Sequence, residues 1–377
     1  MTKAAPILFI EPVAERGGAE AVLLSLLRHM DRARFEPHVA LLADGPLAAE
    51  LAGLATVHRF ARHRVRELVA TIGCVRGLSA LVRAHGIRVL HSQGTKTHLY
   101  GGAVRALTGV PELWHVYDPP PPTPGWIDRV VTRLPTDQLV FISEAPRRAF
   151  AGLMDTARAQ VVHPGIDAPP PPDPAALAAT LARLGIAPDA PLILQVSRLQ
   201  AFKGHATLIA AAALLKERYP DVRVVMAGAT LFGFEEEYPK ELELAIARAG
   251  LTGRVQLAGW LSDAALSALF HHAACLCYAE RVAPYSLVIL EAMAAGRPVV
   301  ASRTAGSELL VEDGVTGRLV PVDDAPAMAA ALGAVLDEPA AATRMGAAGR
   351  ARQAARFTAA GMTRAIEAVH ARLMGAA

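Results

Sequence analysis

Two cations in this sequence are placed where they could bind phosphate. The segment QVSRLQAFKGHATLI puts Arg198 and Lys203 directly after an expected strand, and Gly204 precedes an expected helix. Arginine binds phosphate oxygens through two N–H groups, lysine supplies a compact charge, and a helix N-terminus adds backbone N–H donors. These residues therefore suit a diphosphate, although a pair of solvated loop cations would produce the same pattern.

A carboxylate follows in the stretch APYSLVILEAMAAGRPVVAS. Pro284 and Ser286 are placed to begin a helix, with Ser286 as its cap, and the free N–H groups of that helix would form a second anion site. Glu291 then lies among apolar residues of the same helix, where a carboxylate needs a polar partner. Ribose hydroxyls are suitable partners, and an ion pair with Arg297 is the structural alternative.

Two glycine-containing segments could also approach a ligand. In EPVAERGGAE, Gly17 and Gly18 would let the backbone pass close to a bound group, or would simply form a tight strand-to-helix turn. In RTAGSELLVEDG, Gly306 permits a close approach, Ser307 is expected to cap a helix, and Glu308 lies in its first turn. A helix dipole favours such a carboxylate whatever its function.

A basic stretch, HRFARHRVRE, could meet an anionic partner. A solvated face is the structural interpretation, and an anionic acceptor or a membrane surface is the functional one. The net charge of the whole chain is only +3, which does not indicate nucleic-acid binding. The arginines of this stretch are Arg59, Arg62, Arg64 and Arg66.

The elements that must position these residues alternate between strands and helices. Short β-branched runs predict strands, and amphipathic segments such as 19–30 and 98–107 predict helices between them. This alternation is typical of βαβ units and parallel sheets, whose ligands lie beyond the carboxyl ends of the strands. Strands are expected at 7–10, 38–42, 88–91, 113–116, 139–142 and 160–162, and again at 193–197, 223–227, 255–257, 275–278, 299–302 and 318–320.

A proline-rich segment, APPPPDP at 168–174, separates the two series of elements. Polyproline is a stiff, extended spacer, and 377 residues suit two α/β domains. We therefore predict two doubly wound, Rossmann-like domains that face each other across a cleft. The N-terminal domain would cover 1–168 and the C-terminal domain 169–357, with a final helix in 358–377 packing back toward the first domain.

The composition argues against several classes of protein. Hydrophobic residues make up 53% and charged residues 19%, which is typical of a globular chain. No apolar run approaches the ~18 residues of a spanning helix, and a strand signal near the N-terminus leads us to expect no signal peptide. The three cysteines form neither a metal motif nor a disulfide framework. We expect a cytoplasmic protein, with peripheral contact at the inner membrane left open.

Taken together, these segments resemble the retaining GT-B glycosyltransferases of glycosyltransferase family 4, over nearly the whole chain and in the family's order. GGAE resembles the N-terminal glycine loop, and SRLQAFKG resembles the G-R-L-x-x-x-K-G segment with Ser197 in place of the glycine. LEAMAAGRPVVAS followed by AGSELLVEDGVTGRLV resembles the C-terminal signature. VLHSQG, WHVYD, FISEAPRRAF and HPGID are shorter similarities.

The resemblance implies a role for each segment. Arg198 and Lys203 would hold the diphosphate of a nucleotide-sugar donor and stabilise the charge of the leaving group. His115, in WHVYD, would face the transferred sugar, unless it is a buried structural histidine. Glu291 would bind the ribose, and the backbone of 259–261 would contact the base. The donor-binding residues are expected to be Gly17, Gly18, Gly259, Trp260, Leu261, Tyr285, Ser286, Leu287 and Glu291.

No cofactor is expected in this scheme. The chain contains no Asp-x-Asp metal motif, so Arg198, Lys203 and helix N-termini would supply the electrostatic stabilisation. No carboxylate stands out as a covalent nucleophile, which favours front-face attack with retention. The expected reaction moves a hexose-type sugar from a UDP- or GDP-sugar to a hydroxyl of a glycan, lipid-linked or natural-product acceptor. The sequence does not indicate the oligomeric state.

One position departs from the family's pattern. The signature places a first Glu eight positions before the ribose-binding one, and here that position is Ala283. We favour a relaxed or unusual choice of donor sugar as the explanation, and the alternative is that Glu280 serves the same sugar hydroxyl. Two other functions are alternatives: a GT-B nucleotide-sugar epimerase, for which no acid/base carboxylates stand out, and a non-catalytic two-domain binding protein.

Overall fold

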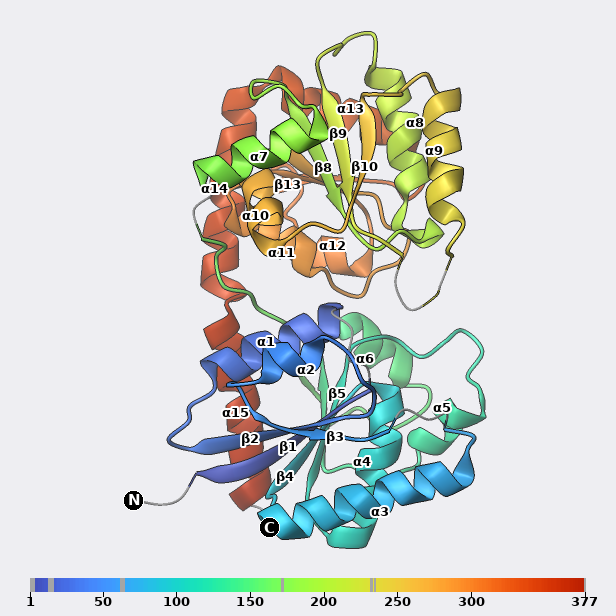
Figure 1. Cartoon of the computed structure of the whole chain (residues 1–377), viewed down its shortest axis with the longest axis vertical. Coiled ribbons are helices and arrows are strands. Elements are labelled where there is room, and N and C mark those ends of the chain that lie inside the picture. The colour runs from blue at the N-terminus through green and yellow to red at the C-terminus, as the bar shows by residue number, and fades with distance from the viewer. Residues whose placement is uncertain are drawn as a thin grey trace. The chain divides into compact units, whose positions relative to one another are not determined.

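The computed structural model describes residues 4–12, 17–61, 65–170, 173–230, 233 and 235–375. The chain divides into two compact units, each built of helices around a sheet (Figure 1). Unit 1 comprises Met1–Ile166 and Thr358–Ala377, and unit 2 comprises Asp167–Phe357.

Unit 1 contains a parallel sheet of seven strands among its described residues, in the order β3-β2-β1-β4-β5-β6-β7. Residues 7–10 of β1 are fully buried, as expected for a central parallel strand that is covered on both faces. The strands are β1 (Ala5–Glu11), β2 (Phe35–Leu41), β3 (Thr56–Arg59), β4 (Val89–Gln93), β5 (Glu112–Val116), β6 (Gln138–Phe141) and β7 (Gln160–Val161).

The helices of unit 1 include one that comes from the far end of the chain. The C-terminal helix α15 packs against α1, and the Asp31 backbone N–H donates to Glu367 Oε1 at 2.7 Å. Ile366 and Val369 of α15 are buried, so its apolar face belongs to the core of unit 1. The helices are α1 (Gly18–His29), α2 (Leu47–Leu51), α3 (Leu68–His85), α4 (Thr95–Thr108), α5 (Trp126–Val131), α6 (Glu144–Phe150) and α15 (Ala359–Gly375).

Unit 2 contains a second parallel sheet, with six described strands in the order β10-β9-β8-β11-β12-β13. Cys275 and Cys277 of β11 are buried free thiols in the core on one face of this sheet. The strands are β8 (Leu192–Val196), β9 (Arg223–Ala227), β10 (Val255–Gly259), β11 (Cys275–Tyr278), β12 (Val299–Ser302) and β13 (Gly317–Val320). The helices are α7 (Pro174–Leu184), α8 (His205–Leu215), α9 (Tyr238–Arg248), α10 (Asp263–His272), α11 (Leu287–Ala294), α12 (Ala305–Leu310), α13 (Ala325–Asp337) and α14 (Pro339–Arg356).

Both sheets are doubly wound, which confirms the predicted fold class of two Rossmann-like domains. Each predicted strand is present, although the ends differ by up to a few residues. Strand β3 was not predicted; it lies at the edge of the first sheet and, among the described residues, pairs with β2 alone. Its residues are half-buried or exposed rather than buried, so no apolar run marked it as a strand.

One expected helix cap and one expected segment boundary were wrong. The cap of α12 is Thr304 and not Ser307, since Thr304 Oγ1 accepts from the Ser307 N–H at 3.2 Å and Ser307 Oγ accepts from the Thr304 N–H at 2.8 Å. The proline spacer predicted at 168–174 extends too far, because its last two residues belong to the start of α7. Asp173 Oδ1 caps α7 by accepting from Ala175 N–H at 2.9 Å, and Pro174 occupies the first helical position, where a proline is tolerated.

Candidate active site

The candidate residues of unit 2 follow two neighbouring strands at the centre of its sheet. The chain runs from β8 toward one edge of the sheet and from β11 toward the other, so the topological switch point lies between them. Arg198 and Lys203 follow β8, whereas Glu280 and Ser286 follow β11. Ligands of open parallel sheets bind at this point, beyond the carboxyl ends of the strands.

Lys203 is held by a buried ion pair. Its Nζ lies 2.7 Å from Glu280 Oε1, and the two side chains are 15% and 5% exposed. Burial raises the pKa of the Glu280 carboxyl, while Lys203, Tyr278 and Arg198 oppose that rise. Arg198 is half-buried, and its charge acts on the same carboxyl. The switch point therefore joins two cations and one carboxylate, a set that the sequence analysis did not bring together.

The segment that carries Lys203 is packed against the segment after β11. Lys203 ends a short 3₁₀ turn, Ala201–Lys203, rather than lying in the expected open loop. Gly204 follows with φ +73°, and a Cβ there would overlap the Ala279 carbonyl. The Arg281 N–H donates to the Phe202 carbonyl at 2.9 Å. Gly204 is thus required by a left-handed conformation and by close packing between the two segments.

Ser197 stands where the family's segment has a glycine. Its hydroxyl lies 3.0 Å from His205 Nε2, at the first residue of α8. His205 is buried, and burial lowers its pKa to about 4, so the ring is neutral near pH 7. The departure from glycine therefore coincides with a contact between the end of β8 and the helix that follows.

Helix α11 begins as predicted. Ser286 Oγ accepts from the Ile289 N–H at 3.2 Å, which makes Ser286 the cap. Glu291 is half-buried on this helix, and Tyr285 and Leu287 are half-buried beside its start. Arg297, the alternative partner for Glu291, donates an N–H to the backbone carbonyl of His271. The helix that follows β11 therefore offers backbone donors at its start and a partly accessible carboxylate at Glu291.

The backbone around Ala283 is fixed by α12. The Gly306 N–H donates to the Ala283 carbonyl at 2.8 Å, and a Cβ on Gly306 would lie 2.8 Å from the backbone of Tyr285. The close approach predicted for Gly306 is therefore an approach to protein backbone. Ala283 itself is 4% exposed.

The segment expected to contact a base lies at the end of β10. That strand extends to Gly259, two residues beyond its predicted end, and the Gly259 carbonyl accepts from the Gly228 N–H at 2.9 Å. Trp260 is 58% exposed and Leu261 is buried. A surface hollow of about 580 Å³ near β10 is lined by Arg183, Glu243, Gln256 and neighbouring residues, and includes none of the candidate site residues.

In unit 1, Gly17 and Gly18 begin α1. The Gly17 N–H donates to Glu20 Oε2 at 2.9 Å, so a side chain of the same helix already satisfies this donor. A Cβ on Gly18 would meet no described atom within 4 Å, and its φ is not positive. Neither packing nor conformation within the described residues requires a glycine at 18. The space beside Gly18 at the start of α1 holds no described atom.

His115 lies on β5 and is 1% exposed. Its Nδ1 is 3.3 Å from His91 Nε2 and 3.4 Å from the Tyr117 hydroxyl. Its Nε2 has no hydrogen-bond partner among the described residues. Burial, followed by the charge of His370, lowers the pKa of His115 to about 3, so the ring is neutral near pH 7. His91, Tyr117 and His370 were not predicted as site residues.

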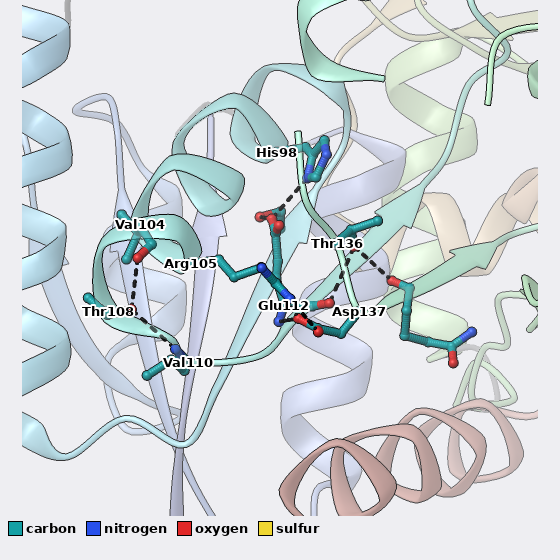
Figure 2. A network of polar contacts seen from close by, with 10 residues as sticks. His98, Val104, Arg105, Thr108, Val110, Glu112, Thr136 and Asp137 are labelled. Carbon is teal, nitrogen blue, oxygen red and sulfur yellow. Dashed lines mark hydrogen bonds and ion pairs between the residues drawn. The ribbon is translucent and has the colours of Figure 1, made fainter. Parts of the chain in front are cut away.

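A polar network holds the start of β5 (Figure 2). Glu112 is fully buried and accepts from His98 Nδ1 at 3.0 Å, while its backbone N–H donates to Asp137 Oδ2 at 2.9 Å. Arg105 binds both oxygens of Asp137, at 2.6 and 2.7 Å. A Cβ on Gly101 would overlap the Glu112 carboxylate. These contacts tie α4 and the segment before β6 to the strand that carries His115.

The basic stretch is only partly described. Arg59, at the end of β3, and Arg66 are exposed, and Arg62 and Arg64 lie outside the described residues. The next helix, α3, exposes Leu68, Val69 and Ile72 by 69%, 87% and 51%. By length and composition it is the one helix in the described part of the chain that is apolar enough to cross a membrane, and 28% of it is buried.

The fold and the site together define a GT-B protein. Among solved structures, HepE of Anabaena in complex with UDP-glucose is 25% identical to this chain, with a TM-score of 0.86, and the match covers 97% of this chain and 99% of HepE. HepE is thus similar over its whole length. Within the residues that the structure describes, no group of His, Cys, Asp and Glu side chains could hold a metal ion.

The sequence comparisons identify the family. Residues 16–168 match the family model described as Glycosyltransferase Family 4, and residues 178–352 match Glycosyl transferases group 1. A D-inositol 3-phosphate glycosyltransferase of Kineococcus radiotolerans is 32% identical over 82% of this chain and 73% of its own. Another of that name, from Streptomyces griseus, is 34% identical over 52% of this chain, which spans about half (45%) of that relative. The chain therefore belongs to glycosyltransferase family 4.

Proposed function

We propose that this protein transfers a sugar from a nucleoside-diphosphate sugar to a hydroxyl group. The observation that carries the proposal is the placement of Arg198 and Lys203, with the capped start of α11, at the switch point of the second sheet. Two cations and a set of helix N–H groups at one strand edge form a site for a diphosphate. The family that the chain belongs to supports the same activity.

The proposed mechanism relies on fixed positive charge. Charge builds up on the departing nucleoside diphosphate, and Arg198 and Lys203 would stabilise it more strongly in the transition state than in the ground state. Glu291, half-buried on α11, would accept hydrogen bonds from the ribose. His115 would contact the transferred sugar. We further propose that the reaction is metal-independent and retaining, with a donor phosphate oxygen taking the proton of the acceptor.

A uridine nucleotide is the first donor to test. HepE, which is similar over the whole chain, was crystallised with UDP-glucose, and this supports a UDP-hexose here. Trp260, which is 58% exposed at the end of β10, provides an aromatic face beside the backbone proposed to contact the base. The absence of a carboxylate at Ala283 remains our reason to expect a relaxed choice of sugar.

An anionic acceptor is proposed for two reasons. The relatives named D-inositol 3-phosphate glycosyltransferase act, by that name, on a phosphorylated cyclitol. The arginine stretch that includes Arg59 and Arg66 supplies positive charge in unit 1. We propose that inositol phosphate is the acceptor to try first, and that lipid-linked and glycan acceptors follow.

The stretch also supports peripheral contact with a membrane. The exposed apolar residues of α3 lie on one side of the helix with Arg76 and Arg83, because residues three, four and seven apart share a helical face. Exposed apolar side chains beside arginines are typical of helices that lie on anionic lipid surfaces. We therefore propose a cytoplasmic protein that can associate with the inner membrane.

One incubation separates the candidate functions. The full chain is mixed with UDP-glucose and D-inositol 3-phosphate, and the products are followed by liquid chromatography, which separates isomeric sugar nucleotides, coupled to mass spectrometry. A transferase releases UDP and adds the mass of a hexosyl residue (a hexose minus water) to the acceptor. An epimerase leaves the nucleotide attached to an isomeric sugar, and a binding protein leaves both reactants unchanged. Failure with a full panel of UDP- and GDP-sugars and acceptors would contradict the proposal.

A further inference from the structure

Three histidines form a continuous chain of contacts inside unit 1. His91 Nδ1 lies 3.1 Å from His370 Nε2, and His91 Nε2 lies 3.3 Å from His115 Nδ1. The rings are 0–1% exposed. They come from β4, β5 and the C-terminal helix α15, which returns to unit 1 from the far end of the chain. The chain of contacts therefore runs from α15 through the sheet to the histidine proposed to contact the sugar.

We propose that His91 and His370 are positioning residues for His115, and that they set which of its ring nitrogens carries the proton. The inference rests on the proposed function, in which His115 contacts the transferred sugar. Neither residue would touch the substrate. Each acts through the next ring in the chain.

The contacts restrict the protons because each ring is neutral. Burial lowers the pKa of His115 and His370 to about 3 and that of His91 well below its ordinary value. A neutral imidazole has one N–H donor and one lone-pair acceptor, and each contact between rings needs one of each. Once the proton of one ring is placed, the other two are therefore determined.

The Tyr117 hydroxyl favours one of the two ways of placing the protons, and the ring contacts through His91 and His370 hold His115 in that state. Its hydroxyl donates to Gln93 Oε1 at 2.8 Å, and its oxygen lies 3.4 Å from His115 Nδ1. A hydroxyl has a single proton, so the second contact is favourable only when His115 Nδ1 carries the hydrogen. His91 then accepts at Nε2 and donates from Nδ1 to His370. This arrangement leaves a lone pair on His115 Nε2.

The placement of the proton on His115 Nδ1 determines which ligand group His115 can bind. His115 Nε2 has no hydrogen-bond partner among the described residues. With a lone pair there, it accepts a hydrogen bond from a hydroxyl, whereas it does not bind a carbonyl or phosphate oxygen. The chain of histidines therefore makes His115 a site for a sugar hydroxyl that donates. Loss of the contacts between the three histidines would let the His115 ring adopt the other tautomer, in which Nε2 carries an N–H in place of the lone pair.

The test measures the tautomer and the rate separately. Full-length protein labelled with ¹⁵N-histidine is studied by long-range ¹H–¹⁵N NMR, and His115→Gln identifies the His115 signals. We expect His115 to be protonated at Nδ1 alone. His91→Phe removes the nitrogen that faces Nδ1, and should produce a mixture of tautomers. We expect kcat to fall by about tenfold to a hundredfold, the range found when a metal-binding histidine loses its hydrogen-bond partner. The Kd of the donor should not change.

Two variants serve as matched controls. His91→Gln keeps an amide where the nitrogen stood, so it should preserve the Nδ1 tautomer and most of kcat. His38→Phe replaces another buried histidine of the same sheet, one that contacts His58 and lies on β2, and should leave the His115 signals unchanged. If His91→Phe does not fold, His370→Phe makes the same measurement one contact further away.

The outcomes are distinct. A wild-type His115 protonated at Nε2, or one that keeps a single tautomer in both Phe variants, overturns the inference. A change of tautomer without loss of kcat in an active enzyme also overturns it. If the wild-type protein transfers no sugar to any acceptor but the tautomer shifts as expected, the positioning role stands and the proposed function fails.

Discussion

Lys203 Nζ lies 2.7 Å from Glu280 Oε1, and both side chains are largely buried at the switch point of the second sheet. The cation proposed to stabilise the leaving group is thus already paired with a carboxylate that burial disfavours as an anion. A diphosphate that binds here would compete for Lys203 and release Glu280. The two residues cannot be assigned roles independently.

We predict that Lys203→Ala and Arg198→Ala each lower kcat far more than they weaken donor binding. Removing one donor that stabilises developing charge typically reduces kcat by about 10²–10³-fold, or about 2.7–4 kcal/mol. Steady-state rates and calorimetric binding of UDP provide the two readouts. Lys240→Ala, at an exposed lysine paired with Glu237, is the matched control. Retained kcat in both site variants would rule out the assignment.

The role of Glu280 can be separated by a panel of donors. If the enzyme accepts many donor sugars, the sequence alone predicts that Glu280→Ala leaves turnover unchanged. The ion pair between Glu280 and Lys203 predicts instead that turnover falls. We expect broad use of UDP-sugars and an equal loss with each of them in Glu280→Gln, because the carboxylate acts through Lys203. Strict preference for one UDP-hexose, together with a loss confined to donors that carry one particular hydroxyl, would instead show that Glu280 replaces the carboxylate missing at Ala283.

We predict full transferase activity in excess EDTA. The proposed stabilisation comes from Arg198, Lys203 and helix N–H groups, none of which needs a metal ion. Turnover is measured after dialysis against EDTA and again after addition of Mg²⁺ or Mn²⁺. Activity that disappears with the chelator and returns with either ion would show that the fixed-cation mechanism is wrong.

We predict that the arginine stretch and α3 bind anionic vesicles. Each arginine near such a surface contributes about 1 kcal/mol at low salt, so replacing Arg59, Arg62, Arg64 and Arg66 with Gln should abolish sedimentation with phosphatidylserine vesicles or impair the use of an anionic acceptor. Val69→Ser should weaken vesicle binding alone, whereas Leu244→Ser, at an exposed leucine of unit 2, should not. UDP affinity should remain intact in all variants. Unchanged vesicle binding and acceptor use would show that the arginine stretch is only a solvated surface.

We predict that unit 1 loses stability as the pH falls below about 6.5. His91, His115 and His370 stay neutral when folded because burial lowers their pKa values, but in the unfolded chain they take up protons near pH 6.5. The unfolded state then binds more protons, so stability decreases toward acid by up to about 1.4 kcal/mol per pH unit for each histidine.

Urea unfolding at pH 7.5 and 5.5 measures this loss through the fluorescence of the buried Trp114, with Trp126 and Trp260 replaced by Phe. The loss between the two pH values should be smaller in His370→Phe, which lacks one of the three groups. Equal stability at both pH values would contradict the neutral, buried state of the histidines.

The sequence by itself determined the local structure of this protein. Hydrophobic runs and their spacing located each predicted strand, the alternation with helices established two doubly wound units, and the ordered motifs established the family, because all of these patterns lie within short stretches of chain. Ser286 was identified as a helix cap for the same reason. β3 was missed because an edge strand with half-exposed residues leaves no apolar run.

Only the tertiary structure decided which distant residues meet. Lys203 and Glu280 are 77 residues apart, and they form a pair because β8 and β11 are neighbours in the sheet. His91 and His370 are 279 residues apart, and they meet because α15 returns to unit 1. The position of α15 depends on where its apolar face can be buried. Such contacts follow from the order of strands and the packing of helices, which no local pattern of residues specifies.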